Sequence, residues 1–226
     1  MRRLLQLAAL IALCSVVYSA WFWYDMRSWR PDEALYPEQG AVIASGLSGL
    51  RFETLKATGA DFVYLELAPG SAATDPKFRE RLKAAREAQL RVGILQRFNP
   101  CERADTQSAR FARMVARDPE LMPPAVALSQ LPQSCDPRVS EAAVTSEVAT
   151  FINQIERHAG KPVILRLSES FENRFRFAQT INRDLWLERD RLRPAYTQRP
   201  WLLWSANSQL VNEASEEPIE WVVVQK

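Results

Sequence analysis

The chain has 226 residues, 47% of them hydrophobic and 25% charged, which indicates a globular domain with a sizeable core and excludes a disordered or collagen-like chain. Its 29 Lys and Arg residues nearly balance 27 Asp and Glu residues, so it lacks the one-signed field of a nucleic-acid-binding protein. Only one histidine is present, which disfavours His-rich metal sites. We expect no metal, no cofactor and no nucleic-acid partner, and any acid–base chemistry would use carboxylates.

The N-terminus carries a long uncharged run. Leu4 to Tyr24 comprises 21 residues without a charge, a length that spans about 30 Å as a helix. It predicts a transmembrane helix at about residues 4–24, inside an anchor and flank of residues 1–30. The aromatic cluster Trp21 to Tyr24 is typical of a membrane interface, and it favours a retained anchor over a signal peptide cleaved near Ser19.

The charges that flank the uncharged run and the positions of the cysteines indicate the cellular compartment of the domain. The N-terminal arginines Arg2 and Arg3 favour an inside N-terminus and an exported C-terminal domain. With Cys14 in the anchor, only Cys101 and Cys135 remain in the domain, as an oxidising compartment would allow if they pair. Two unrelated buried thiols are the alternative.

Residues 31–39 contain two prolines and several charges, and they predict a tether before a domain of residues 40–226. A β/α alternation follows. Asp75 is the expected N-cap of a helix that has Pro76 at its first position. The predicted elements are strands at 61–67, 91–98 and 125–128 and helices at 75–90 and 104–117.

The clearest helical pattern begins at Ser140, an N-cap, and ends at Gly160. Its apolar residues recur at helical period on one face: Val144, Val148, Phe151, Ile152 and Ile155. Strand candidates follow at 162–167, 184–187, 200–204 and 219–224. The predicted fold class is α/β, an irregular (β/α) barrel of the TIM-like type preceded by one transmembrane helix, with its groove where the strands end.

A series of short motifs in a fixed order resembles glycoside hydrolase family 25, the muramidases, from about Tyr36 to Val224. The resemblance implies an irregular α/β barrel that cleaves the β-1,4 bond between N-acetylmuramic acid and N-acetylglucosamine in peptidoglycan. It implies peptidoglycan as a partner. Together with the predicted N-terminal anchor, it leads us to expect a bacterial inner-membrane protein with its domain on the periplasmic side and the lipid bilayer as a second partner. The motifs are Gln39-Gly40, Gly59 to Tyr64, Asp75 to Phe78, Arg91 to Gly93, Phe98 to Cys101, Arg117 to Pro119, Leu121 to Val126, Gly160 to Pro162, Ser170-Phe171, Leu185-Trp186, Pro200-Trp201 and Trp204.

Four of the family's acidic groove positions are not acidic in this chain. Val42 and Pro69 stand where the resemblance places the aspartate of the first strand and the glutamate of the second. Ala127 and Ser129 stand at the Asp-x-Glu that follows the paired prolines, and the family's C-terminal Asp-x-Asn becomes Glu220 to Val222. Glycoside hydrolysis needs a carboxyl acid and a second carboxylate. The sequence therefore predicts a catalytically inactive muramidase-like domain with no catalytic residues.

Two inactive functions and one active function stay open. The domain would bind a glycan strand in a groove lined by Tyr64, Gln96, Arg97, Arg166 and Trp204, or it would act as a scaffold for another envelope protein. The alternative is an active muramidase with relocated carboxylates, whose candidates are Glu66, Glu169, Glu172 and Glu188. That alternative requires two carboxyl groups roughly 5–10 Å apart across one cleft.

Two pairings inside the barrel are expected from the same interpretation. Glu66 would pair with Arg97 or Arg166 if it is structural rather than catalytic. Cys101 follows the third strand and Cys135 the fourth, so a barrel places both on adjacent loops at one end. We therefore predict a disulfide between them.

Overall fold

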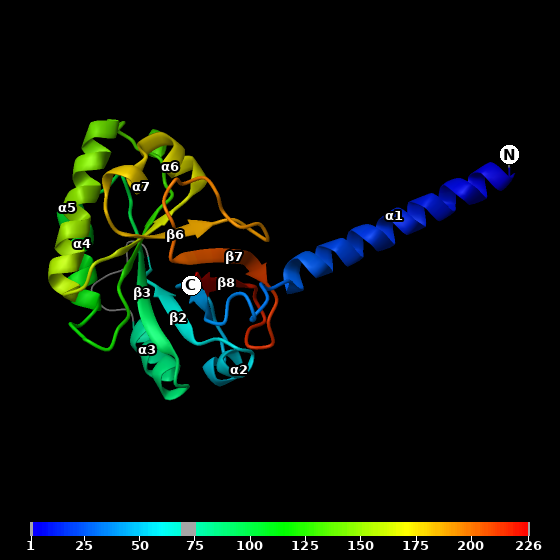
Figure 1. Ribbon diagram of the computed structural model, residues 1–226, viewed down its shortest axis with the longest axis horizontal. Helices are drawn as coiled ribbons and strands as arrows, with labels where there is room; N and C mark the ends of the chain where they lie inside the picture. Colours follow the sequence, from blue (N-terminus) through cyan, green and yellow to red (C-terminus); the bar gives the residue numbers. More distant parts are fainter. Residues whose placement is uncertain (1, 69–75, 226) are drawn as a thin grey trace.

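The computed structural model describes residues 2–68 and 76–225, in which a long helix projects from a closed barrel (Figure 1). The helix α1 spans Arg2–Ser28. The strands close in chain order: β1 Gln39–Ile43, β2 Phe62–Glu66, β3 Arg91–Arg97, β4 Ala125–Leu128, β5 Ile164–Leu167, β6 Asp184–Glu188, β7 Leu203–Leu210 and β8 Ile219–Val224.

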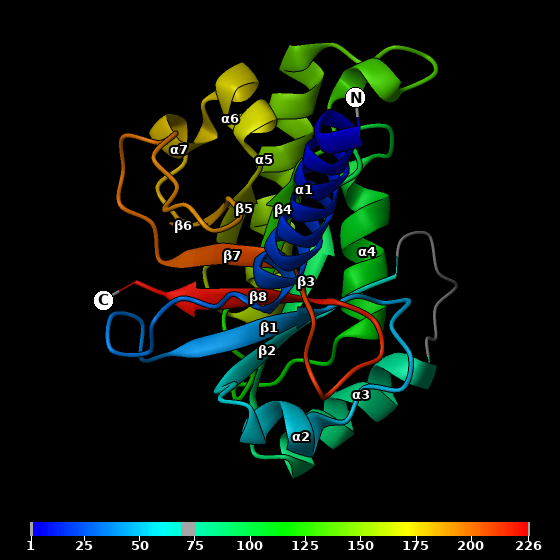
Figure 2. The same ribbon diagram turned by 90° about the vertical axis from the view of Figure 1, so that its right-hand side faces the viewer.

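The barrel is parallel from β1 to β7, and β8 closes it by pairing antiparallel with both β7 and β1. Helices cover only part of its outside (Figure 2). The connections β6–β7 and β7–β8, which are described throughout, contain no helix. The helices between the other strands are α2 Phe52–Ala57, α3 Pro76–Glu87, α4 Ala104–Met114, α5 Glu141–Ala159, α6 Glu169–Phe175 and α7 Phe177–Thr180, with a 3₁₀ turn at Pro132–Ser134.

Helix α5 forms as its sequence predicts. The Ser140 hydroxyl accepts a hydrogen bond of 3.2 Å from the backbone N–H of Ala143, and Gly160 ends the helix with φ of 70°. The apolar stripe of α5 is fully buried, and its neighbour across the helical layer is α4. Asp75, the expected cap of α3, lies outside the described residues.

The strands separate two apolar cores. One cluster contains residues from every strand and none from a helix, so it fills the lumen of the barrel; it includes Val42, Tyr64, Ala127 and Trp186. The other lies between the sheet and the helices. Gly93 is required in the lumen, because a Cβ there would lie 2.3 Å from the Tyr64 ring.

The N-terminal segment 29–39 packs on the outside of β7 and β8, beside the end of α1. Trp29 and Tyr36 contact the Trp204 ring, with centroids 6.2 and 5.7 Å apart. The Arg30 guanidinium lies 5.0 Å from the centroid of Trp221. These residues, predicted as a tether with its start at residue 31, therefore cover apolar surface of the barrel.

The predicted fold class needs correction. The barrel is a closed eight-stranded sheet whose last strand runs antiparallel, and its β/α alternation stops after β6. The transmembrane helix predicted at about residues 4–24 is wrong, because no helix in the described part of the chain is long and apolar enough to cross a membrane. The prediction counted only charges, whereas Gln6, Ser15 and Ser19 make the uncharged run partly polar.

Candidate functional site

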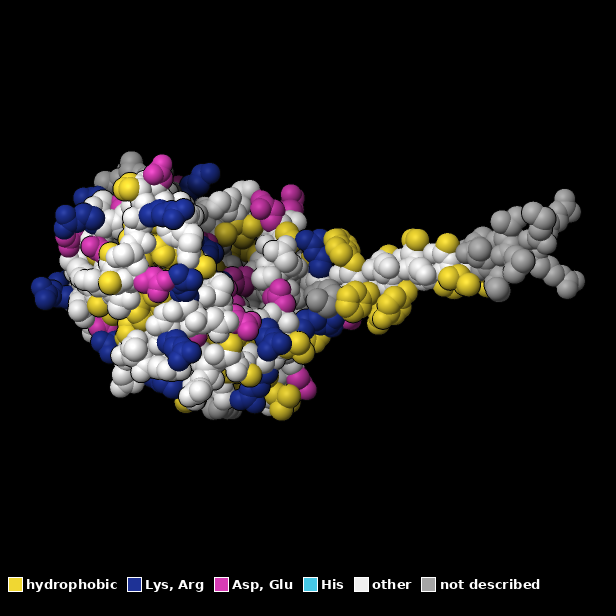
Figure 3. All heavy atoms as spheres, turned by 90° about the horizontal axis from the view of Figure 1, so that it is seen from above, with side chains coloured by type: hydrophobic (Ala, Val, Ile, Leu, Met, Phe, Trp, Pro, Cys, Tyr) yellow, Lys and Arg dark blue, Asp and Glu magenta, His cyan; other side chains and the backbone are white. Residues whose placement is uncertain are grey.

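Charged side chains meet at the barrel mouth, the end where the parallel strands finish. We call Glu66, Arg97, Arg166, Glu188, Ser205 and Glu220 the mouth cluster. Those on the parallel strands follow a lumen residue at a spacing of two, as Glu66 follows Tyr64, whereas Glu220 precedes the luminal Val222 by two on the antiparallel β8. On the outer surface shown in Figure 3, acidic and basic side chains are interspersed, in line with the near-neutral composition.

Arg166 is the centre of the mouth cluster. Its Nε donates to Glu188 at 2.6 Å and its Nη2 donates to Glu220 at 3.0 Å. Burial lowers the pKa of Arg166, but the Glu220 and Glu188 carboxylates outweigh that effect and raise the pKa, so the guanidinium stays charged. Its Nη1 is the buried side-chain polar atom without a hydrogen-bond partner among the described residues. The guanidinium also lies over the Trp186 ring, 5.2 Å from its centroid.

Further contacts tie the cluster to the lumen. Trp186 Nε1 donates to the Ser205 hydroxyl at 2.7 Å, and that hydroxyl donates to Glu220. Glu66 is paired with Arg97, one of the two partners that the sequence suggested for it. The sheet register places Ala127 level with Arg97 on one side and Arg166 on the other. The mouth therefore holds two arginines and three glutamates, each of which has an ionic partner.

The residues predicted to line a glycan groove do not share one surface. Arg97 and Arg166 are in the mouth cluster, and Tyr64 lies below it in the lumen, buried, with its hydroxyl donating to Pro123 O at 3.1 Å. Burial raises the pKa of Tyr64. Gln96 is buried beside the luminal Leu95 and faces the opposite side of the sheet, and Trp204 packs in the outer core.

Two of the fallback carboxylates lie on helix α6 and not on a strand. Glu169 is exposed in the first turn of α6. Glu172 is buried one turn later and accepts a hydrogen bond of 3.0 Å from the backbone N–H of Ala178. Burial raises the pKa of Glu172 above its ordinary value, against the hydrogen bonds from Ala178 and Phe177. Glu172 therefore connects α6 to α7.

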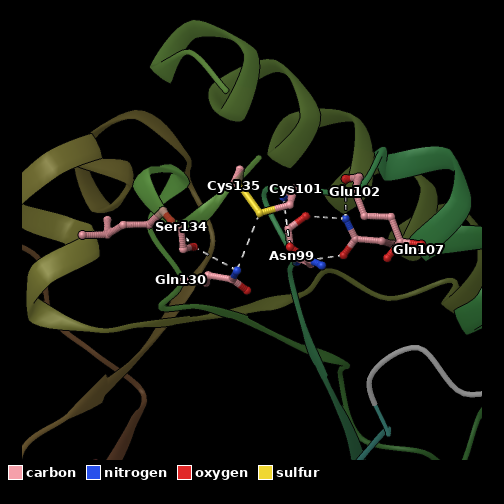
Figure 4. Close-up of a disulfide and its surroundings, with 8 residues drawn as sticks. Asn99, Cys101, Glu102, Gln107, Gln130, Ser134 and Cys135 are labelled. Carbon is pink, nitrogen blue, oxygen red and sulfur yellow. Dashed lines mark hydrogen bonds between the residues drawn. A yellow bond between two sulfur atoms is a disulfide. The ribbon is translucent and has the colours of Figure 1, made fainter. Parts of the chain in front are cut away.

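The predicted disulfide is confirmed. Cys101 and Cys135 are joined, with Cα atoms 5.2 Å apart. Their loops leave β3 and β4 at the barrel mouth (Figure 4). The Cys101 loop is held by Gln107, whose Nε2 donates to the carbonyls of Asn99 and Glu102, both at 2.8 Å.

Comparison with known families assigns this barrel. The family model described as Glycosyl hydrolases family 25 matches residues 43–212, about three quarters of the chain. The chain belongs to glycosyl hydrolase family 25. The resemblance seen in the sequence motifs is thereby confirmed.

Solved structures of the same family share the fold. A family 25 glycosyl hydrolase from Bacillus anthracis is 22% identical, with a TM-score of 0.77 over 88% of this chain and 93% of that one. A bacterial lysozyme from Streptomyces coelicolor is 15% identical, with a TM-score of 0.70 over 84% and 92% of the two chains. A GH25 lysozyme from Aspergillus fumigatus is 17% identical, with a TM-score of 0.68 over 84% and 94%. Among curated proteins, none matches this chain.

At four of the positions where a family 25 enzyme is expected to carry acids, this family member has apolar or small side chains. Val42 and Ala127 point into the lumen and are buried. Ser129 is half-buried just beyond β4, and Pro69 lies outside the described residues. Among the described residues, the carboxylates that form ion pairs at the mouth are those of the mouth cluster.

Glu220 and Ser205 were not among the predicted site residues. The signal was present, because Glu220 alternates with Trp221 and Val222 on an apolar strand and so shares the luminal side with Val222. In the family resemblance, Glu220 stands where the C-terminal aspartate is expected. Its role depends on Arg166, which comes from β5 and approaches it across the lumen.

Proposed function

We propose that this family 25 barrel no longer cleaves peptidoglycan and that it holds a glycan strand instead. The observation that carries the proposal is the pairing of the mouth carboxylates: Glu66 with Arg97, and both Glu188 and Glu220 with Arg166. A glycosidase needs one carboxyl group that donates a proton to the leaving oxygen and a second carboxylate on the other side of the bond.

Glu188 and Glu220 are the strongest case for retained activity, and Arg166 argues against it. Because both contact one guanidinium, their separation is below the upper limit of about 9.5 Å for a pair of catalytic carboxylates. The guanidinium, however, lies between them, at the place that a glycosidic oxygen would need. Arg166 therefore takes hydrogen-bonding positions on both carboxylates that a sugar would otherwise use.

A scaffold for another envelope protein is the second candidate, and the filled lumen favours it. Tyr64 and Trp186 contact each other inside the barrel with ring centroids 4.9 Å apart, and both are buried. Neither offers a free ring face to a sugar at the mouth. A glycan strand therefore has to bind at the rim of the mouth or beyond it.

The disulfide supports an extracytoplasmic location for the proposed activity. Cys101 and Cys135 are bonded, and such bonds persist in oxidising compartments. Peptidoglycan is met in the same place. The location would be overturned if both thiols alkylate rapidly in the protein isolated from its native cell under non-reducing conditions.

Incubation of the full chain with purified peptidoglycan tests the three functions together. Co-sedimentation without release of reducing ends is the expected result. Release of reducing ends that is lost in both Glu188→Gln and Glu220→Gln variants would establish the active alternative and refute the proposal. If the chain neither co-sediments with peptidoglycan nor releases reducing ends, the scaffold function remains. An active muramidase run in parallel controls for the quality of the substrate.

A further inference from the structure

A pocket of about 610 Å³ opens where α1 meets the strand ends β6 and β7. That volume is within the range of small-ligand sites, roughly 300–1,000 Å³. We call it the α1 pocket. Its lining includes Phe22, Trp23 and Arg27 of α1 and Asp190, Asn207 and Gln209 of the barrel. Figure 3 shows apolar and basic side chains gathered at this junction.

The two walls of the α1 pocket are fixed to each other. Arg191 forms an ion pair of 2.7 Å with Asp25, and the backbone N–H of Val211 donates to Arg27 O at 2.8 Å. Asn207 Nδ2 donates to Trp29 O at 2.9 Å. Contacts on both sides of the last turn of α1 therefore hold the helix against β7, so the pocket is formed before any ligand arrives.

The lining combines aromatic faces with oriented polar groups. Trp23 is 60% exposed and Phe22 is 47% exposed, although both are next to the barrel. The Asp190 carboxylate accepts hydrogen bonds from Ser208 N at 2.7 Å and Ser208 Oγ at 2.8 Å, which orient it and leave lone pairs for a ligand. A pyranose ring has an apolar C–H face that stacks on an aromatic ring and hydroxyl groups that bond to carboxylates and amides.

The α1 pocket continues the rim of the barrel mouth. Asp190 follows Glu188 by two residues and Asn207 follows Ser205 by two residues, and Glu188 and Ser205 are partners in the sheet register. Because β6 and β7 are parallel, the segments that follow Glu188 and Ser205 extend past the mouth in the same direction. The pocket therefore lies beside the mouth cluster.

From this geometry we propose that the α1 pocket is a saccharide subsite for a glycan strand lying along the mouth. The Arg27 guanidinium lies over one face of the Trp23 ring, 4.5 Å from its centroid, so the opposite face of Trp23 is the stacking platform. Asp190 and Gln209 bond to sugar hydroxyls. The inference rests on the proposed function for the kind of ligand, but it assigns the binding to residues outside the mouth cluster.

Co-sedimentation of the full chain with purified peptidoglycan, measured over a range of protein concentrations, tests the subsite. We expect Trp23→Ala to weaken binding about tenfold and Gln209→Ala to weaken it severalfold, as for residues at the centre of a binding site. Tyr24→Ala is the matched control, because Tyr24 is an equally exposed aromatic residue of α1 that does not line the pocket. It should bind as the wild type does.

Each other outcome overturns the inference in a recognisable way. If the wild type binds and Trp23→Ala binds equally well, the subsite is wrong while the proposed function stands. If Trp23→Ala and Tyr24→Ala are weakened alike, α1 adsorbs through apolar contact and has no saccharide site. If the wild type does not bind, the proposed function fails first and the subsite fails with it.

Discussion

Removing Arg166 should be among the most destabilising single changes in this barrel. Its side chain is only 6% exposed, and Arg166→Leu would leave Glu188 and Glu220 without their cation. Breaking a buried ion pair from one side costs about 3–5 kcal/mol, because the remaining charge is uncompensated. The Glu188 and Glu220 side chains are 29% and 14% exposed, so Glu220 carries more of this penalty.

Thermal and urea denaturation measure the effect. A loss of about 3–5 kcal/mol lowers the Tm of a chain of this size by about 6–20 °C. The triple variant Arg166→Leu, Glu188→Gln and Glu220→Gln removes the charges together, and we expect it to recover most of the loss, since neutral replacement of a buried ionic group is often tolerated.

A surface pair supplies the control. Arg174 and Glu141 form an ion pair with side chains 48% and 51% exposed, so Arg174→Leu should cost less than about 1 kcal/mol. If Arg166→Leu costs no more than Arg174→Leu, the mouth cluster is not a buried network. Arg166 would then not be what holds the carboxylates away from catalysis.

Three further predictions concern stability. Trp29→Ala should cost about 2 kcal/mol in urea denaturation, because the ring packs on Trp204 although it is only partly buried; equal stability would show that the N-terminal segment is a loose tether. Cys101→Ser should lower stability by about 2–4 kcal/mol, and reductant should reproduce that loss in the wild type but not in the variant. Glu172→Gln should stabilise the protein at neutral pH, because burial raises the pKa of Glu172 in the folded state. Because the folded pKa of Glu172 is raised, its contribution to the free energy of unfolding is fully present below the unfolded pKa of about 4.5. That contribution is lost as the pH rises through the folded pKa. The stability difference between variant and wild type should therefore vanish in acid. A stability difference between Glu172→Gln and the wild type that stays constant across pH would contradict the raised pKa of Glu172.

Local rules in the sequence determined the individual elements of the barrel. Helix α5 has its cap at Ser140, its buried stripe and its αL glycine at Gly160, all readable without a structure because they depend on residues within one helix. The strand Ala125–Leu128 is as short as its apolar run. The family and the pairing of Cys101 with Cys135 could also be predicted from the sequence. The order of the motifs indicates the barrel topology, and that topology places the two cysteines on adjacent loops.

Only the tertiary structure decided which side of the sheet each groove candidate faces and which charges meet. Gln96 and Arg97 are adjacent in sequence, yet only Arg97 enters the mouth cluster, because successive side chains of a strand point to opposite faces. Arg166, Glu188 and Glu220 come from three strands and meet because the barrel closes on itself. The place of Trp23 beside Asp190 likewise depends on how the last turn of α1 docks on β7, a contact between distant segments that no local pattern encodes.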